Sequence, residues 1–327
     1  MSTVGANSAT LKDIASRLDE DNKVAKVIEI LAQNNEILDD MKFMEGNLAT
    51  GHKTTIRTGI PAGTWRKLNY GVTQEKSTTA QVTDTCGMLE SYSKVDKALV
   101  ELNGNESEFR ASEDVAFIEG LSQTFADIVF HGDTSLNPER FMGLEPRYSD
   151  TTAENGENII LGGGSGADNA SIYLVVWGDQ SVHGIYPRGS VAGLKHTDLG
   201  ESTLTDAAGG EYQGLRTHYK WDGGLTVKNW KYVVRIPNID ISDLTKDAAT
   251  GADLVDLITQ ALELPPNLNG AAIYCNKTIR SMLRRQIKNS NNVHLSLDEV
   301  AGKKVLSFDG VPVRRCDVLT NAESLVA

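Results

Sequence analysis

The sequence predicts an α+β fold, and the prediction rests on three stretches that differ in their pattern of apolar and polar residues. The first is a long amphipathic helix over 106–131, and the second is a β-rich stretch over 171–240. The third alternates helix and strand over 245–320, which is typical of an α/β module. A chain of 327 residues, 40% hydrophobic and 23% charged, is typical of a soluble globular protein with about two domains.

The helix over 106–131 is expected to form the spine of the fold. At 1.5 Å per residue it would be roughly 30 Å long, and it carries no residue pair that indicates chemistry. Ser112 is a candidate N-cap, and Gly132 follows the last periodic residue, where a helix commonly stops. The apolar residues that recur at three- and four-residue spacing are Phe117, Ile118, Leu121, Phe125, Ile128 and Val129.

Residues 1–48 are expected to form a helical N-terminal arm. Their apolar residues follow a heptad seam, in which Asn34 is a polar position that could set the register. The arm could pair with another subunit or pack on its own domain, and the pattern favours neither. Leu31 and Leu38 are the candidate interface residues of the arm. The seam comprises Val24, Val27, Leu31, Asn34, Leu38 and Met41.

Residues 49–92 are expected to form an extended hairpin that projects from the body. The stretch is rich in Thr and poor in large apolar residues, so it cannot supply a core of its own. Such a hairpin usually becomes ordered against a neighbour, although a surface loop is the alternative. Its exceptions, Trp65, Leu68 and Tyr70, are therefore candidate subunit-interface residues.

Residues 93–240 are expected to form a domain that contains the spine helix and one antiparallel sheet. Within it, GENIILGGGSGADN lacks the Gly-Lys-Ser/Thr ending of a P-loop, so a turn between strands is favoured over a nucleotide site. Apolar residues then alternate with Arg216, His218 and Lys220, and later with Lys231 and Arg235. The polar face so predicted is either a basic contact patch or a solvated surface.

Residues 241–327 are expected to form a second domain with the closing strands. A helix over 254–262 ends at Pro265-Pro266, and Asn276 is expected to cap the next helix. The basic residues of that second helix could contact nucleic acid or another subunit, or could be solvated. They are Arg280, Arg284, Arg285 and Lys288.

Composition also limits the function. The net charge of −12 disfavours general wrapping of nucleic acid, and residues 1–20 lack the features of a signal peptide, so we expect cytoplasmic assembly. Three distant cysteines fit reduced thiols better than a disulfide framework. We find no paired His, nucleophile elbow or carboxylate cluster, and therefore expect no catalytic residue, metal or cofactor.

The order of these parts resembles the major capsid proteins of tailed bacteriophages, in particular the podophage branch of the HK-ninety-seven type. The resemblance rests on TTIRTGIPAGTWRKLNYG, on NPERFMGL after the spine helix, and on closing NGAAIYCNKTIRSMLRRQ and FDGVPVRRCDVL. It also rests on two long central stretches, VVWGDQSVHGIYPRGSVAGLKHTDLG and THYKWDGGLTVKNWKYVVRIPNID.

The resemblance implies a structural protein that is not an enzyme. It would assemble into hexamers and pentamers of an icosahedral virion shell around double-stranded DNA, without sequence-specific binding or a membrane. The 93–240 domain would be peripheral and the 241–327 domain axial. Portal, scaffolding and decoration or cement proteins would be partners.

In the usual order of that family, strands flanking the spine helix come partly after the axial module. Strands resembling them come earlier here, so we hypothesise a permuted connection. The alternatives are an encapsulin-like nanocompartment around enzyme cargo and a small-molecule-binding enzyme.

Overall fold

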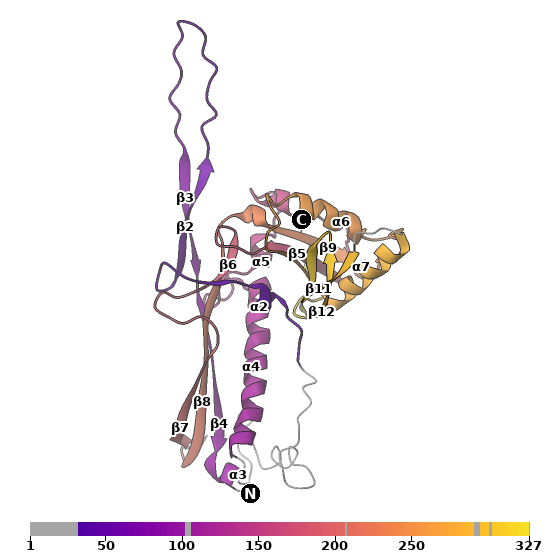
Figure 1. Ribbon diagram of the computed structural model, residues 1–327. Coiled ribbons are helices and arrows are strands. Elements are labelled where there is room, and N and C mark those ends of the chain that lie inside the picture. Colours follow the sequence, from indigo (N-terminus) through magenta and orange to yellow (C-terminus); the bar gives the residue numbers. More distant parts are fainter. Residues whose placement is uncertain (1–31, 102–105, 207, 291–294, 301–302, 327) are drawn as a thin grey trace.

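The computed structural model describes residues 32–101, 106–206, 208–290, 295–300 and 303–326. Within these residues the chain forms three sheets around one long helix, α4 (Glu106–His131). Figure 1 shows a two-stranded hairpin that projects beyond the C-terminal end of α4 and a long sheet that runs beside the helix. A third sheet, accompanied by two helices, lies to the side of that same end.

The spine helix predicted from the sequence is confirmed as α4. The apolar side chains of its C-terminal half are buried, and Phe125 stacks on Trp221 of the neighbouring sheet with ring centroids 4.3 Å apart. The helix ends at Gly132, whose N–H donates to Ile128 O over 2.9 Å. A side chain there would meet Phe141 O at 2.4 Å, so only glycine fits. The predicted cap Ser112 is wrong, because α4 begins several residues before it.

A five-stranded sheet runs along α4 in the order β1-β6-β8-β4, with β7 also pairing with β8. Tyr219 and Trp221 of β8 are buried, whereas Lys220 between them is partly exposed, so the predicted alternation is confirmed. The apolar face of β8 packs on α4, where Phe117 stacks on Tyr219. The strands are β1 (Phe43–Glu45), β4 (Gly87–Asp96), β6 (Val182–Tyr186), β7 (Lys195–Thr205) and β8 (Glu211–Val227).

A six-stranded sheet has the order β11-β12-β13-β10-β5-β9 and shares a second core with α6 (Leu254–Glu263) and α7 (Lys277–Ser290). Asp253 caps α6 by accepting from the N–H groups of Val255 and Asp256. Asn276 accepts from Ile279 N over 2.9 Å, which confirms the predicted cap of α7. The strands are β5 (Asn169–Val176), β9 (Val233–Asp240), β10 (Ala271–Cys275), β11 (Leu295–Val300), β12 (Lys303–Phe308) and β13 (Val311–Arg315).

The sequence predicted one antiparallel sheet over 171–240, and this is wrong. Strands β5 and β9 pair with each other, and β5 continues the sheet to β10, beyond residue 241. Every residue of these two strands is buried, as expected for strands covered on both faces, whereas β7 and β8 alternate. The hypothesis of a permuted connection fails with it, because β5 and β9 lie inside the sheet expected to be axial.

The heptad helix predicted for the arm is wrong over its described part. Only Ile37–Asp40 (α2) is helical there, and the described residues before it form no helix, with Asn35 in an isolated bridge to Cys316. Asn34 does not set a helical register, because its backbone pairs with Asp317 near the C-terminus. These inter-segment hydrogen bonds outweigh the local preference for a helix. The rest of the seam, Val24 to Leu31, lies outside the described residues.

The glycine-rich segment after Ile160 is an extended strip beside β9. The N–H groups of Gly162 and Gly164 donate to Pro237 O and Asn238 O, each over 2.8 Å, and Gly166 N donates to Asp240. Three of the amides that a phosphate would need are therefore already used. This supports the interpretation of the segment as a connection.

Short helices complete the described chain: α3 (Lys97–Glu101), α5 (Leu144–Arg147) and the 3-10 turns η1 (Gly156–Asn158) and η2 (Trp230–Tyr232). The helices in the described part of the chain fall short of what a membrane crossing requires in length and apolar character.

Candidate assembly surfaces

The predicted hairpin consists of β2 (Gly51–Gly59) and β3 (Thr78–Thr85), which pair in antiparallel register. The intervening loop turns at Lys67–Tyr70, where Asn69 adopts a left-handed backbone conformation with φ of 63°. Gly63 N donates to Glu75 Oε2 across the loop over 3.2 Å. Among the described strands these two pair only with each other, and they extend away from the body (Figure 1).

The tip of the hairpin carries the most exposed large apolar side chains of the described residues. Trp65 is 100% exposed, Leu68 85% and Tyr70 70%, so the three predicted candidates share one solvent-facing loop. Ile60 and Val72 lie in the same loop and are also exposed, and neither was predicted as an interface residue. Their signal was present in the sequence, since each is an apolar residue in a polar, threonine-rich stretch.

The root of the hairpin is anchored by Asp84 of β3. Its carboxylate, 6% exposed, accepts from Arg147 Nη2 over 2.7 Å and from Thr226 Oγ1 over 2.5 Å. His52 lies opposite Asp84 on β2, and its ring meets the His183 ring edge-on, with centroids 5.9 Å apart. Burial, reinforced by the nearby positive charge of Lys228, lowers the pKa of both imidazoles, that of His183 to about 4.

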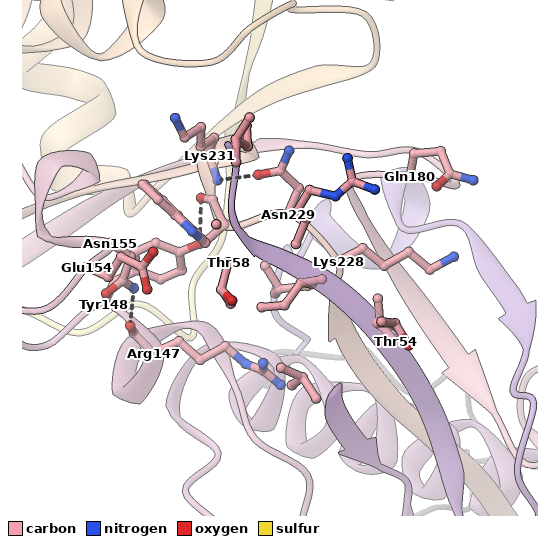
Figure 2. A pocket seen from close by; sticks show the side chains of 18 residues that line it. Thr54, Thr58, Arg147, Tyr148, Glu154, Asn155, Gln180, Lys228, Asn229 and Lys231 are labelled. Carbon is pink, nitrogen blue, oxygen red and sulfur yellow. Dashed lines mark hydrogen bonds between the residues drawn. The ribbon is translucent and has the colours of Figure 1, made fainter. Parts of the chain in front are cut away.

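A polar groove of about 750 Å³ lies between the hairpin and the turn that precedes β9 (Figure 2). Arg57 of β2 faces it together with Lys228 and Lys231, while Glu154 is its single carboxylate. Tyr148 Oη donates to Trp230 O over 2.8 Å at the groove wall. The described lining holds no His, Cys or Ser.

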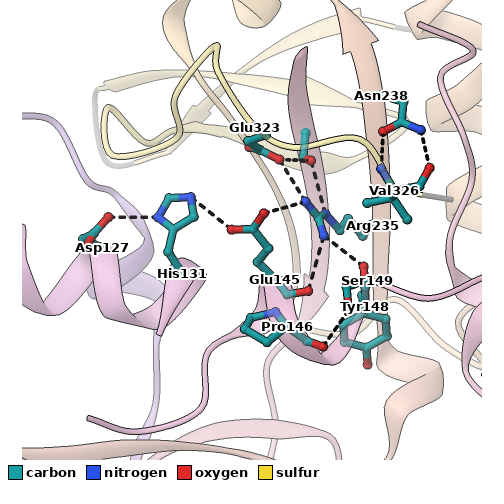
Figure 3. A network of polar contacts seen from close by, with 11 residues as sticks. Asp127, His131, Glu145, Pro146, Tyr148, Ser149, Arg235, Asn238, Glu323 and Val326 are labelled. Carbon is teal, nitrogen blue, oxygen red and sulfur yellow. Dashed lines mark hydrogen bonds and ion pairs between the residues drawn. The ribbon is translucent and has the colours of Figure 1, made fainter. Parts of the chain in front are cut away.

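A buried polar network joins α4, α5, β9 and the C-terminal segment (Figure 3). Arg235, 1% exposed, donates to Glu323 Oε2 over 2.9 Å and to Glu145 Oε1 over 3.1 Å. His131 contacts Asp127 at 2.9 Å and Glu145 at 3.7 Å. Burial opposes a charge on His131, but the hydrogen bond with Asp127 and the nearby Glu145 outweigh it, and the pKa of His131 is raised.

Arg235 was predicted on the polar face of a sheet, and this is wrong. Its strand is buried on both faces, so the guanidinium points into the molecule, where carboxylates and carbonyl oxygens satisfy it. The sequence offers no local signal for this, because the partners Glu145 and Glu323 are 90 and 88 residues away.

Of the remaining predicted basic residues, those of the sheet and Arg280 have acidic or aromatic partners nearby, whereas Arg284, Arg285 and Lys288 of α7 are exposed. Lys220 and His218 both contact Glu90 at 3.1 Å, and the guanidinium of Arg216 lies over the Tyr92 ring. Arg280 of α7 reaches Glu36 at 3.7 Å. On the sheet, this pattern supports a balanced, solvated surface rather than a basic patch for nucleic acid.

The two arm candidates have different positions. Leu31 lies outside the described residues, whereas Leu38 of α2 is half-buried and packs against the core that contains α4. Among the residues that the structure describes, no three His, Cys, Asp or Glu side chains gather in a way that could hold a metal ion.

Comparisons with known proteins agree with this architecture. A family model described as "Major capsid protein GP7" matches residues 19–327. A chain in the near-atomic-resolution structure of bacteriophage Epsilon15 is 37% identical, with a TM-score of 0.79, and the match covers 100% of this chain and 99% of that chain. A comparison with curated proteins gives no match.

Two further solved structures are much more distant. The capsid of bacteriophage JBD30 is 10% identical with a TM-score of 0.49, covering 92% of this chain and 93% of that chain. The SrpI encapsulin of Synechococcus elongatus is 9% identical with a TM-score of 0.42, covering 70% and 96%. Likenesses this distant carry no argument about function.

Proposed function

The chain belongs to the major capsid protein family GP7, and on that premise we propose that it assembles into hexamers and pentamers of an icosahedral shell around double-stranded DNA. Family membership makes it a structural, shell-forming protein of a phage virion and not an enzyme. We propose, beyond family membership, that the shell is icosahedral and that it contains double-stranded DNA.

The observation that carries the proposal is the projecting hairpin with an apolar tip. A two-stranded hairpin without a core is marginal in water, and large apolar side chains on a monomer surface usually mark a contact with another protein. We propose that Trp65, Leu68 and Tyr70 pack on a neighbouring subunit. Each such side chain contributes about 1.5–3 kcal/mol when it is fully buried.

Modest contacts of this kind are sufficient for a closed shell. Each subunit in a symmetric assembly gives and receives the same contact, so every copy is held at several places at once. Leu31 and Leu38 of the arm remain proposed contributors. The half-buried Leu38 could present only its exposed part to a neighbour.

The charge of the chain supports a protein that encloses DNA without binding it tightly. The net charge is −12, and the basic side chains of the sheet have acidic or aromatic partners, so phosphate contacts there would be few. The proposal includes portal, scaffolding and decoration or cement proteins as partners, and assembly in the host cytoplasm. It includes no cofactor and no sequence-specific DNA contact.

Negative-stain electron microscopy tests the proposal directly. The full chain would be expressed alone and with the neighbouring viral genes, and we expect closed shells, or tubes and sheets of the same subunits. A discrete monomer or dimer under both conditions would contradict it. Shells that contain a bound enzyme and no DNA, produced with those neighbouring genes, would instead establish the nanocompartment alternative.

A further inference from the structure

Helix α7 presents an exposed face whose charged side chains are all basic. The helix contains five basic residues and no Asp or Glu. At 3.6 residues per turn, the side chains of Lys277, Arg284 and Lys288 fall within an arc of roughly 40°, and Arg285 lies beside them. All four are exposed, whereas Leu283 on the other side of the helix is buried in the second core. The outer face of α7 is therefore cationic in a chain whose net charge is −12.

Acidic side chains of the same subunit reach only the N-terminal half of α7. The charge of Lys277 acts on the Asp317 carboxylate, and Arg280 pairs with Glu36 at 3.7 Å. The other basic residues of the helix form no ion pair with another described residue, and they are Arg284, Arg285 and Lys288.

Helix α6 presents an exposed face of the opposite charge. The helix and its cap residue contain three carboxylates and no Lys or Arg, and the carboxylates belong to Asp253, Asp256 and Glu263. Asp256 and Glu263 are exposed within an arc of roughly 20°, opposite the buried Ile258. They lie seven positions apart, about 10.5 Å, as Lys277 and Arg284 do on α7. The two faces therefore match in sign and in spacing.

These two faces do not pair with each other inside one subunit. Helices α6 and α7 cover the same face of the six-stranded sheet, and Gln286 of α7 joins them by accepting from Leu254 N over 3.0 Å. Figure 1 shows both helices at the edge of the molecule, away from α4 and the hairpin. Each charged face lies opposite the core, so both point outward, and among the described residues no ion pair joins the two helices.

We infer that the basic face of α7 packs on the acidic face of α6 of a second subunit, an inference that rests on the proposed self-assembly. The contact joins unlike surfaces. Each copy can therefore give its basic face to one neighbour and receive the basic face of another on α6, and the contact repeats from copy to copy.

A second copy fits these surfaces better than nucleic acid does. Phosphates would pair with Arg284 and Lys288, but Asp256 and Glu263 on the adjacent helix would repel them. A second copy provides partners for both faces at once. A single exposed ion pair contributes little, so the value of the contact lies in its selection of which surfaces meet and in its repetition around an assembly.

Charge reversal tests the pairing in the full-length chain. The α7 variant carries Arg284→Glu with Arg285→Glu, and the α6 variant carries Asp256→Lys with Glu263→Lys. Each should raise the concentration needed for assembly at least about tenfold, because like charges would then face each other. The chain with all four substitutions restores opposite charges and keeps the net charge of −12, so it should assemble within about threefold of the wild-type concentration.

The control is Lys94→Glu with Arg188→Glu, which changes the net charge as the α7 variant does, at exposed residues outside both helices. It should assemble like the wild type. Normal assembly of the α7 variant, or no recovery in the chain with four substitutions, would overturn the inference. Normal shells of the α7 variant that hold less DNA would also overturn it, because α7 would then face nucleic acid. If the wild type itself does not assemble, the proposed function fails together with the inference.

Carbodiimide cross-linking of assembled particles provides a second measurement. The reagent joins an amine to a carboxylate that it contacts directly, and particles built from isotopically light and heavy subunits distinguish links between copies from links within one. We expect peptides that link Lys277 or Lys288 of one copy to Asp256 or Glu263 of another. Links confined to one copy, or none between α7 and α6, would overturn the inference.

Discussion

Arg235 Nη2 donates to Glu323 Oε2 over 2.9 Å, and this ion pair ties the C-terminal segment to the buried sheet (Figure 3). The guanidinium also reaches Glu145 and Tyr148 O, and Ser171 donates to the same Glu323 carboxylate. A buried charge is tolerated when its hydrogen-bonding groups are satisfied, and removal of one partner leaves it poorly compensated.

Glu323→Ala should therefore lower the free energy of unfolding by about 3–5 kcal/mol. Glu157→Ala is the matched control, because its ion pair with Lys231 is exposed and 3.8 Å long. Such surface pairs contribute less than about 1 kcal/mol. Urea denaturation of the unassembled subunit measures both variants, and similar losses in the two would contradict the assigned role of Glu323.

Protonation of His183 should make the free energy of unfolding depend on pH. Its folded-state pKa of about 4 lies below the ordinary 6.5, so the folded protein favours the neutral imidazole. Above pH 6.5 this imidazole is largely neutral in both the folded and the unfolded chain, so it does not lower the free energy of unfolding. As the pH falls from about 6.5 to about 4, the free energy of unfolding falls by about 1.4 kcal/mol per pH unit. The reason is that the unfolded chain binds the proton and the folded chain does not.

His183→Gln removes this titration. Urea denaturation at pH 7 and pH 5 should show a smaller fall in unfolding free energy for the variant than for the wild type, by more than about 1 kcal/mol. An identical pH dependence in the two proteins would show that His183 is not held neutral at the hairpin root.

The root of the hairpin should be intolerant of a side chain at Gly51. A Cβ there would lie 2.0 Å from Asp84 O on the paired strand, so Gly51→Ala must push the two strands apart. Gly71→Ala is the control, since a side chain in that exposed loop meets nothing within 4 Å. Hydrogen exchange should speed up in β2 and β3 for Gly51→Ala alone, and equal protection in the two variants would contradict this.

The apolar tip should matter for assembly and not for folding. Trp65→Ala removes a fully exposed side chain, so the unfolding free energy should change by less than about 0.5 kcal/mol. Loss of a buried aromatic contact in the shell should raise the critical concentration for assembly at least about tenfold. Light scattering measures this concentration, and Gln74→Ala, which changes a polar residue of the same loop, is the control. Normal assembly of Trp65→Ala would show that the tip is not part of the interface.

Elements with a local pattern were predictable from the sequence. The periodicity of α4, the alternation in β8 and the capping role of Asn276 each depend on residues a few positions apart, so one stretch contains all the information. The apolar residues of the hairpin tip were equally visible, because they interrupt a polar stretch. The function was predicted from the resemblance of several long stretches to one family.

Sheet membership was not predictable in this way. The apolar run of β5 fits any buried strand, and its pairing with β9 and β10 joins residues up to about one hundred positions apart. The same limitation applies to Arg235, whose charged side chain in an alternating pattern indicated an exposed face.

Local periodicity and composition were enough to predict the long helix, the strand-rich and mixed stretches, and the apolar residues on an otherwise polar hairpin. The three-dimensional structure was needed to show which strands share a sheet, that the backbone of Asn34 pairs with Asp317, and that Arg235 is buried between Glu145 and Glu323. These depend on long-range contacts, whose hydrogen bonds and buried area outweigh local preference and leave no periodic trace in the chain.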